Sequence, residues 1–154
     1  MFDKKDYQIL STLQQNSRTT ASEIADLVKM SISAVTERIK KLKDNGTVES
    51  YTAKLNAKEL GFDLAAYIAV VSSSSEHYEE IIQKSIKHPA VLECHSVTGD
   101  GSHMLKVRVR NSSELEQLLR DIQSWPGVIR THTSVIMSTY KEGFELDLTS
   151  LNNT

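Results

Sequence analysis

Apolar residues in the first 45 positions recur at helical spacing in three short stretches, and polar residues separate these stretches. Asp3 is placed to cap the first helix, which the spacing predicts over residues 3–16. Thr20 and Glu23 have the spacing of a capping box and open a second, short helix. The apolar faces consist of Ile9, Leu10 and Leu13 in the first stretch, Ile24, Leu27 and Val28 in the second, and Val35, Ile39 and Leu42 in the third.

The third stretch predicts a helix that begins after Ser31 or Ser33 and ends near Asn45, with Gly46 as its stop. About three residues separate the second and third helices, which is the spacing of a helix-turn-helix motif. Residues 47–55 then alternate in a strand-like pattern, which predicts a β-ribbon wing or an extended arm beside the helices. The following stretch to residue 63 contains Gly61 and is interpreted as a linker.

The remaining chain alternates strand, helix, strand, strand, helix, strand. Strands are predicted over residues 65–72, 91–98, 104–110 and 128–137, and helices over 76–87 and 113–125. Ser113 and Glu116 have capping-box spacing at the start of the second of these helices. The expected inward residues are Ile81, Ile82 and Ile86 on one helix, and Leu115, Leu118, Leu119, Ile122 and Trp125 on the other.

Two segments repeat a pattern of proline, a small residue, valine, an aliphatic residue and, three positions later, histidine. They span residues 88–95 and 125–132, and each ends a helix and starts a strand. Two βαβ halves related in this way form a ferredoxin-like βαββαβ sandwich, in which both helices cover one face of a four-stranded antiparallel sheet. The expected fold class is therefore α+β, with a winged helix-turn-helix first and the ferredoxin-like part second.

The predicted sheet has a face without helices. Alternation along residues 104–110 places Leu105, Val107 and Val109 on one side and Lys106, Arg108 and Arg110 on the other. An uncovered sheet face indicates a partner. We expect a helix-turn-helix domain over 1–50, a ribbon strand and linker over 51–63, an effector-binding and oligomerisation domain over 64–140, and a C-terminal tail over 141–154.

Composition narrows the class of protein. The 154 residues carry a formal net charge of −2, which argues against nonspecific coating of nucleic acid or acidic membrane. Residues 1–61 hold ten Lys/Arg and eight Asp/Glu, a balance of +2, and residues 62–154 hold eight and twelve, a balance of −4. The absence of a long apolar run and of a secretory signal, together with a single cysteine, predicts a cytoplasmic protein.

Candidate catalytic and metal sites fail on geometry. Cys94 and His95 are neighbours on a predicted strand, so their side chains point to opposite faces. A group of Cys94, Asp100 and His103 has no activating motif beside it, and Gly99 and Gly101 are too few for a phosphate-binding fingerprint. We therefore expect no enzyme activity, no cofactor and no metal site.

The outward face of the third helix carries the clearest functional pattern. Short hydroxyl residues lie near its N-terminus and cations lie behind them, as in an element that enters the major groove and contacts phosphates. A merely solvated helix face is the alternative, and the helix-turn-helix spacing argues against it. By helical projection, Ser33, Thr36, Glu37 and Lys40 face base edges, and Arg38, Lys41 and Lys43 lie nearer phosphates.

These positions resemble the Lrp/AsnC (leucine-responsive/asparagine regulator, feast/famine) family of transcription regulators. The resemblance begins with Asp6, Ile9, Leu10 and Leu13, continues through the second and third helices to Gly46 and Val48, and extends over Val97, Thr98 and Gly99 and over Pro126, Gly127 and Val128 to Ser138. It implies a winged helix-turn-helix joined by an extended strand to a ferredoxin-like effector domain. It further implies dimers that assemble into octamers, wrap double-stranded DNA and respond to amino acids.

Two departures from the family pattern stand out. Lys29 occupies the turn between the second and third helices, where the family has glycine. The family's effector loop reads Gly-x-Tyr-Asp-aromatic, whereas this chain has glycine, serine and histidine after Asp100. The resemblance places effector contacts at Thr98, Gly99, Asp100, Gly101, Ser102, His103, Thr131 and Thr133. These side chains favour a small polar or acidic amino acid over leucine.

Two other functions remain as alternatives. The first is a stand-alone amino-acid-sensing subunit that modulates an enzyme without binding DNA. The second is an RNA-binding protein, because RNA-recognition motifs share the βαββαβ topology. The basic strand over residues 104–110 has no aromatic residue for base stacking, which disfavours RNA binding as the function.

Overall fold

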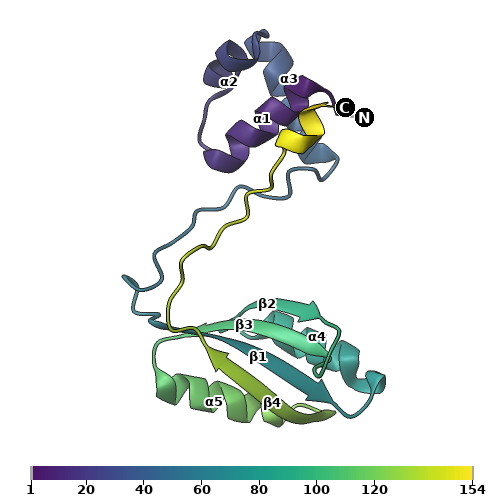
Figure 1. Ribbon diagram of the computed structural model, residues 1–154, viewed down its shortest axis with the longest axis vertical. Helices are drawn as coiled ribbons and strands as arrows, with labels where there is room; N and C mark the ends of the chain where they lie inside the picture. Colours follow the sequence, from purple (N-terminus) through teal and green to yellow (C-terminus); the bar gives the residue numbers. More distant parts are fainter. Residues whose placement is uncertain (1, 154) are drawn as a thin grey trace. The chain divides into compact units, whose positions relative to one another are not determined.

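The computed structural model describes residues 2–153, which divide into two compact units (Figure 1). The helical unit contains the chain up to Lys54 together with the segment from Lys141 onward, and the sheet unit spans Leu55–Tyr140. No helix among the described residues is long and apolar enough to cross a membrane.

Three helices build the helical unit: α1 (Lys4–Gln15), α2 (Ala21–Val28) and α3 (Ile32–Asp44). Their apolar faces meet in one small core, as the helical spacing predicts. The buried core residues are Ile9, Leu13, Ile24, Ala25, Val28, Val35 and Leu42. Leu27, expected on the apolar face of α2, is instead 60% exposed, because Ala25 takes the inward position.

The helix ends follow local chemistry. Asp3 and Asp6 form a capping box on α1, Thr20 and Glu23 form one on α2, and the Ser31 side chain caps α3. Lys29 adopts the left-handed conformation, with φ of 55°, at the turn between α2 and α3. A residue with a Cβ in this conformation costs roughly 1 kcal/mol relative to glycine, so the helix-turn-helix is formed in spite of the missing glycine.

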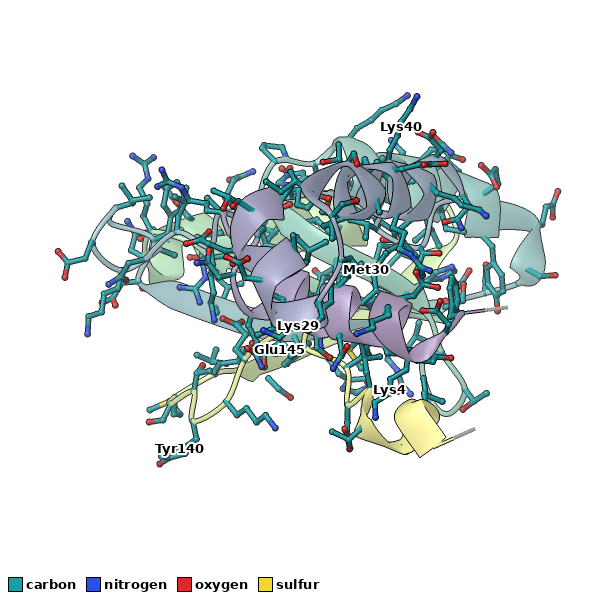
Figure 2. The ribbon with its side chains drawn as sticks, turned by 90° about the horizontal axis from the view of Figure 1, so that it is seen from above. Lys4, Lys29, Met30, Lys40, Tyr140 and Glu145 are labelled. Atoms are coloured by element: carbon teal, nitrogen blue, oxygen red, sulfur yellow. The ribbon has the colours of Figure 1, made fainter. Side chains whose placement is uncertain are left out.

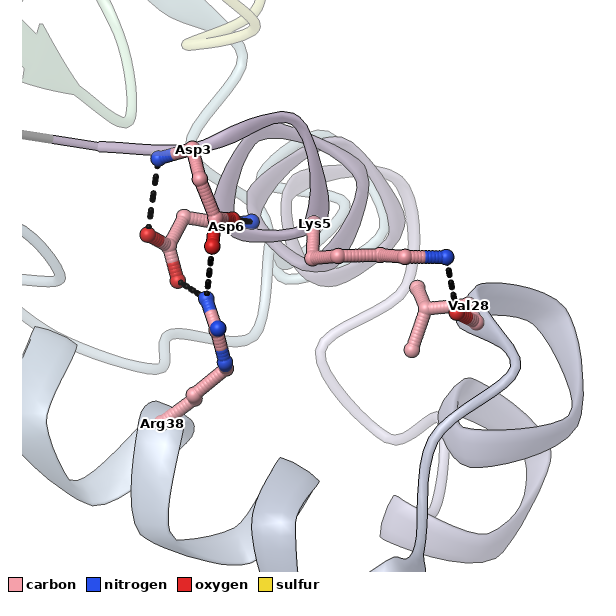
Figure 3. Close-up of polar contacts among 5 residues, drawn as sticks. All are labelled: Asp3, Lys5, Asp6, Val28 and Arg38. Atoms are coloured by element: carbon pink, nitrogen blue, oxygen red, sulfur yellow. Dashed lines mark hydrogen bonds and ion pairs between the residues drawn. The ribbon is translucent and has the colours of Figure 1, made fainter.

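A double ion pair fastens α1 to α3 (Figure 3). The guanidinium Nη1 of Arg38 lies 2.8 Å from Asp3 Oδ2 and 2.7 Å from Asp6 Oδ1. These contacts raise the pKa of Arg38 through its hydrogen bonds to Asp6 and Asp3. Lys5 Nζ donates to the Val28 carbonyl and ties α1 to the end of α2. The N-terminal turn of α1 is thus bound to both other helices.

Of the two forms expected for residues 47–55, a β-ribbon wing or an extended arm, the ribbon is wrong, because no strand forms there among the described residues. Val48 N–H donates back to the Leu42 carbonyl at 3.0 Å, and no neighbouring segment pairs with the rest as a ladder. Strand-like alternation cannot produce a ribbon without a partner strand. The C-terminal tail ends in a short 3₁₀ helix, η2 (Thr149–Asn153), which contacts α1.

The sheet unit has the predicted ferredoxin-like order of elements. They are β1 (Leu64–Ser72), η1 (Ser75–His77), α4 (Tyr78–Lys87), β2 (Val91–Ser96), β3 (His103–Val109), α5 (Ser112–Gln123) and β4 (Val128–Val135). The strands pair antiparallel in the order β2-β3-β1-β4, and both helices lie on one face of the sheet (Figure 1). This order puts His95 of β2 and His132 of β4 on opposite edge strands.

The core lies between the sheet and the helices. Its buried members are Ala66, Ile68, Val70, Leu105, Val107 and Val109 of the sheet, with Ile81, Leu115, Leu118, Ile122 and Trp125 from the helical side. Two expectations about these helices are wrong. Ile86 is 67% exposed and Ser85 is buried in its place, its hydroxyl donating to the Ile81 carbonyl at 2.8 Å. Helix α5 is capped by Asn111 rather than Ser113, because the chain enters the helix two residues earlier.

The opposite sheet face carries no helix. Tyr67 lies in its middle, 40% exposed, in register with Lys106 on β3 and Ser134 on β4. Lys106 Nζ lies 3.3 Å from Glu93 Oε1, and Glu93 also pairs with His95 at 3.3 Å. The face therefore carries charged side chains together with apolar Ala65, Ala69 and Met104 around a tyrosine, and no described element within the sheet unit covers it.

His103 lies at the start of β3 and is completely buried. Its Nδ1 lies 2.9 Å from the Ser102 hydroxyl, and its ring packs edge-on against Tyr78 with centroids 4.9 Å apart. Its Nε2 is buried without a hydrogen-bond partner among the described residues. Burial lowers the pKa of His103 from its ordinary value of 6.5, since a charged imidazole is poorly solvated there.

We expect this histidine to make the stability of the protein depend on pH. The folded state holds His103 neutral, whereas the unfolded chain takes up a proton as pH falls below 6.5. The stabilisation is therefore fully present above that value and is lost as pH falls from it toward the lowered pKa. Chemical denaturation at pH 7.5, 6.5 and 5.5 should show a decline in unfolding free energy that is shallower in His103→Leu. Equal slopes in the two proteins would contradict this account.

Candidate nucleic-acid interface and effector site

The outward face of α3 is open to solvent along its length. Ser33, Glu37 and Lys40 recur at helical spacing on the side opposite the buried Val35 and Leu42, and Thr36 lies beside them. All four outward side chains are exposed, and Figure 2 shows Lys40 projecting from the helix. The geometry that groove insertion needs is therefore present: an apolar back held in the core and a polar front that nothing in the helical unit covers.

The hydroxyl groups near the start of α3 are oriented by the helix itself. Ser33 Oγ lies 3.1 Å from Ser31 Oγ, the helix cap, and Thr36 Oγ1 donates to the Ile32 carbonyl at 2.8 Å. A hydroxyl that donates within the helix keeps lone pairs for an outside donor. In the part of the chain that the structure describes, Thr36 is thus prepared to accept from a base or a water.

The cations of α3 divide into bound and unbound groups. Arg38 is half-buried in its ion pairs with Asp3 and Asp6, so it joins two helices here, and it can make the predicted phosphate contact only by leaving these carboxylates. Lys43 Nζ donates to the Glu49 carbonyl and lies 5.9 Å from the centroid of the Tyr51 ring. The side chains of Lys40 and Lys41 are exposed and make no hydrogen bond or ion pair with any described residue. They are the free positive charges of this helix.

The ion pairs of Arg38 with α1 were not predicted from the sequence, although the sequence contains a signal for them. Asp3 and Asp6 lie in the first turn of α1, and two carboxylates on one turn attract a cation from outside the helix.

The sequence also did not predict a shallow cavity of about 470 Å³ in the sheet unit. Lys58, Asp63, Arg110 and Asn111 are among its lining residues, and its cations are already paired, Lys58 with Asp63 at 3.9 Å and Arg110 with Glu114 at 2.5 Å.

The expected effector loop is a tight connection between β2 and β3. Val97 N–H donates to the Ser102 carbonyl at 3.1 Å, and Ser102 N–H donates to the Val70 carbonyl of β1 at 2.9 Å. Gly99 has φ of +108°, which only glycine adopts readily. Thr98, Gly99 and Asp100 are exposed, Gly101 and Ser102 are half-buried, and His103 is buried beneath them. The loop can present its backbone and Asp100 to a ligand, but not His103 as it stands.

The structure does not bring the two expected parts of the effector site together within one chain. Thr131 pairs with Val70, and Thr133 pairs with Ile68, so β1 lies between these threonines and the loop that leads into β3. Two strand spacings amount to about 10 Å. Thr131 Oγ1 also accepts a hydrogen bond from Gln123 of α5 at 3.0 Å. A single small ligand would touch both parts only where more than one chain contributes.

The residues rejected as catalytic candidates remain separate. Cys94 packs against the sheet core, whereas His95 is bound to Glu93 on the other face. No group of three or more His, Cys, Asp or Glu among the described residues could hold a metal ion.

Comparisons with known proteins agree with both units. Residues 2–49 match a family model described as winged helix-turn-helix DNA-binding, and residues 65–146 match the Lrp/AsnC ligand binding domain. The HTH-type transcriptional regulator FL11 of Pyrococcus abyssi is 34% identical over 146 residues, which cover 95% of this chain and 96% of that protein.

Solved structures give the same result. A transcriptional regulator from Neisseria meningitidis in complex with L-Met has a TM-score of 0.93 and 29% identity, with 98% of this chain and 99% of that chain covered. Escherichia coli AsnC has a TM-score of 0.88 and 25% identity, with 94% and 98% covered. Two domain matches in series and relatives that span nearly the whole chain place the protein in one family: it belongs to the Lrp/AsnC family of transcriptional regulators.

Proposed function

We propose that this regulator binds double-stranded DNA with α3 in the major groove. Ser33, Thr36, Glu37 and Lys40 face base edges, and Lys41 contacts a phosphate. The observation that supports this most directly is that Lys40 and Lys41 are exposed and unpaired among the described residues, while Arg38 is committed to α1. Lys43 stabilises the segment after α3 and reaches a phosphate only if it leaves the Glu49 carbonyl.

Salt dependence separates the two kinds of contact. After selection of a preferred site from random duplex DNA, Lys41→Ala should weaken binding to all sequences and flatten the slope of log K against log salt by about one unit. Changing Ser33 or Lys40 to Ala should alter sequence preference by roughly 1–3 kcal/mol.

Lys87→Ala provides the control, since it removes one exposed positive charge from α4 of the sheet unit. Fluorescence anisotropy at several salt concentrations measures each affinity. If Lys40→Ala and Lys41→Ala bind the selected site like Lys87→Ala, the assignment of α3 is wrong.

The protein acts, in this proposal, as a homodimer joined through the helix-free sheet face, and dimers assemble further, up to octamers. The uncovered face around Tyr67 and its charged neighbours favours a second copy of this chain as the partner. A twofold pairing brings the same surface of both chains into one interface and covers both at once. Paired recognition helices then match two half-sites spaced by about one helical turn of DNA or a multiple of it.

Multi-angle light scattering tests this assembly. The wild-type chain should be a dimer or larger at micromolar concentration, and Tyr67→Arg should shift it toward monomer by adding charge beside Lys106. Ile86→Arg, on the exposed side of α4, should keep the dimer. A monomeric wild type would refute the architecture.

The sheet unit, we propose, binds a small polar or acidic amino acid at the loop over residues 98–103, with Thr131 and Thr133 supplied from a neighbouring chain. Backbone amides around Gly99 and Gly101 suit a carboxylate, because glycine allows close approach of the chain. Asp100 is exposed and can accept from an ammonium group. The bound L-Met of the Neisseria regulator supports an amino-acid ligand in this class of domain.

Calorimetric titration with each of the twenty amino acids tests the ligand class. We expect a polar or acidic amino acid to bind most tightly, and Asp100→Asn or Ser102→Ala to weaken that binding. Ser113→Ala, at an exposed position in the first turn of α5, is a control that should leave it unchanged. Tight binding of leucine or phenylalanine that survives Ser102→Ala and His103→Ala would show that the loop is not the recognition element.

A further inference from the structure

The C-terminal segment from Lys141 onward follows β4 in sequence but belongs to the helical unit. The chain therefore passes between the two units twice, once near residue 54 and once near residue 140. The end of the segment, η2, lies beside α1 and contacts it (Figure 1). A second covalent connection that ends in a docked segment constrains the helical unit more than a single linker does.

The main contact pairs a side-chain amide with a peptide group. Gln14 Nε2 donates to the Leu146 carbonyl at 2.7 Å, and Leu146 N–H donates to Gln14 Oε1 at 3.1 Å. Both hydrogen-bonding groups of one residue of the segment are thus satisfied by one side chain near the end of α1. Lys54 adds a hydrogen bond to the Glu142 carbonyl at 2.9 Å and an ion pair with its carboxylate at 3.4 Å.

The docked segment buries little apolar surface. Phe144 is 88% exposed and Leu146 is 70% exposed, while Leu148 is half-buried. Solvent-exposed hydrogen bonds and a weak apolar contact make a dock that opens easily. Such a segment is suited to release and return rather than to permanent attachment.

Helix α1 connects the docked C-terminal segment to α3, the proposed recognition helix. Gln14 lies near one end of α1, and Asp3 and Asp6 at the other end hold Arg38 of α3. Because α1 is a continuous helix with its N-terminal turn capped and ion-paired, displacement of its C-terminal end is passed to α3. In the sheet unit, β4 ends at Val135, a few residues before the segment begins, and β4 carries Thr131 and Thr133.

We propose that the segment from Lys141 to Leu151 is a detachable tether that couples β4 to the recognition helix through α1. When docked, it restricts the orientations of the helical unit and so lowers the entropic cost of placing two recognition helices on DNA. Its role in DNA affinity rests on the proposed function, whereas its docking on α1 does not.

Hydrogen exchange of the full-length protein tests the docking. The Leu146 amide should exchange at least tenfold more slowly than in a free chain, and Gln14→Ala should return it to within about twofold of the free rate. Gln15→Ala is the matched control, since it removes the same side chain one position along α1, where the side chain is exposed and makes no hydrogen bond with a described residue. A wild-type Leu146 amide that exchanges at the free-chain rate overturns the proposal.

DNA binding tests the coupling separately. With the site selected from random DNA as the probe, Gln14→Ala and a chain ending at Tyr140 should bind about threefold or more weakly, and Gln15→Ala should bind within twofold of wild type. Equal affinity in all of these proteins overturns the coupling. Failure of the wild type to bind any DNA is instead a failure of the proposed function, and the exchange result still decides whether the segment docks.

Discussion

Alternation of apolar and polar residues along β1 and β3 is the constraint from which most of the architecture follows. Ala66, Ile68 and Val70 on one strand face the same side as Leu105 and Val107 on the other, and α4 and α5 can cover only that side. An antiparallel sheet can leave its second face to water, and here that face holds Tyr67 among charged side chains. The need for a partner, and with it the proposed dimer, is a consequence of one-sided burial.

The helical unit is likewise limited by how much apolar surface it can bury. A core of seven buried residues leaves little hydrophobic stabilisation to spare, so caps and the contacts of Arg38 carry a larger share of its order. Arg38 cannot be both a fastener and a free cation. The ion pairs of Arg38 therefore leave Lys40 and Lys41 for the proposed DNA contacts, and they fix α1 to α3.

The effector end of the sheet unit shows how a change in a loop alters chemistry without altering the fold. The strand pairing that aligns Ser96, His103, Val70 and Thr131 requires only that β3 begin at residue 103. A histidine at that position is buried and kept neutral, and its hydroxyl partner Ser102 lies in the loop itself. In the proposed effector site, ligand recognition consequently depends on backbone amides, Asp100 and the groups that a neighbouring chain supplies.

Elements with local causes follow from the amino-acid sequence alone. Helix positions, the N-cap at Asp3, the capping box at Thr20, the stop at Gly46 and the βαββαβ order all depend on residues within a few positions of one another, and all were predicted. Tertiary structure set the partners of Arg38, 32 and 35 residues away, and the docking of Leu146 on Gln14, 132 residues away. It also decided that residues 47–55 form no strand and that Ser85 replaces Ile86 inside. Backbone periodicity specifies which face an element presents, but a contact between distant segments depends on where the whole chain brings them, and a strand exists only where another strand satisfies its hydrogen bonds.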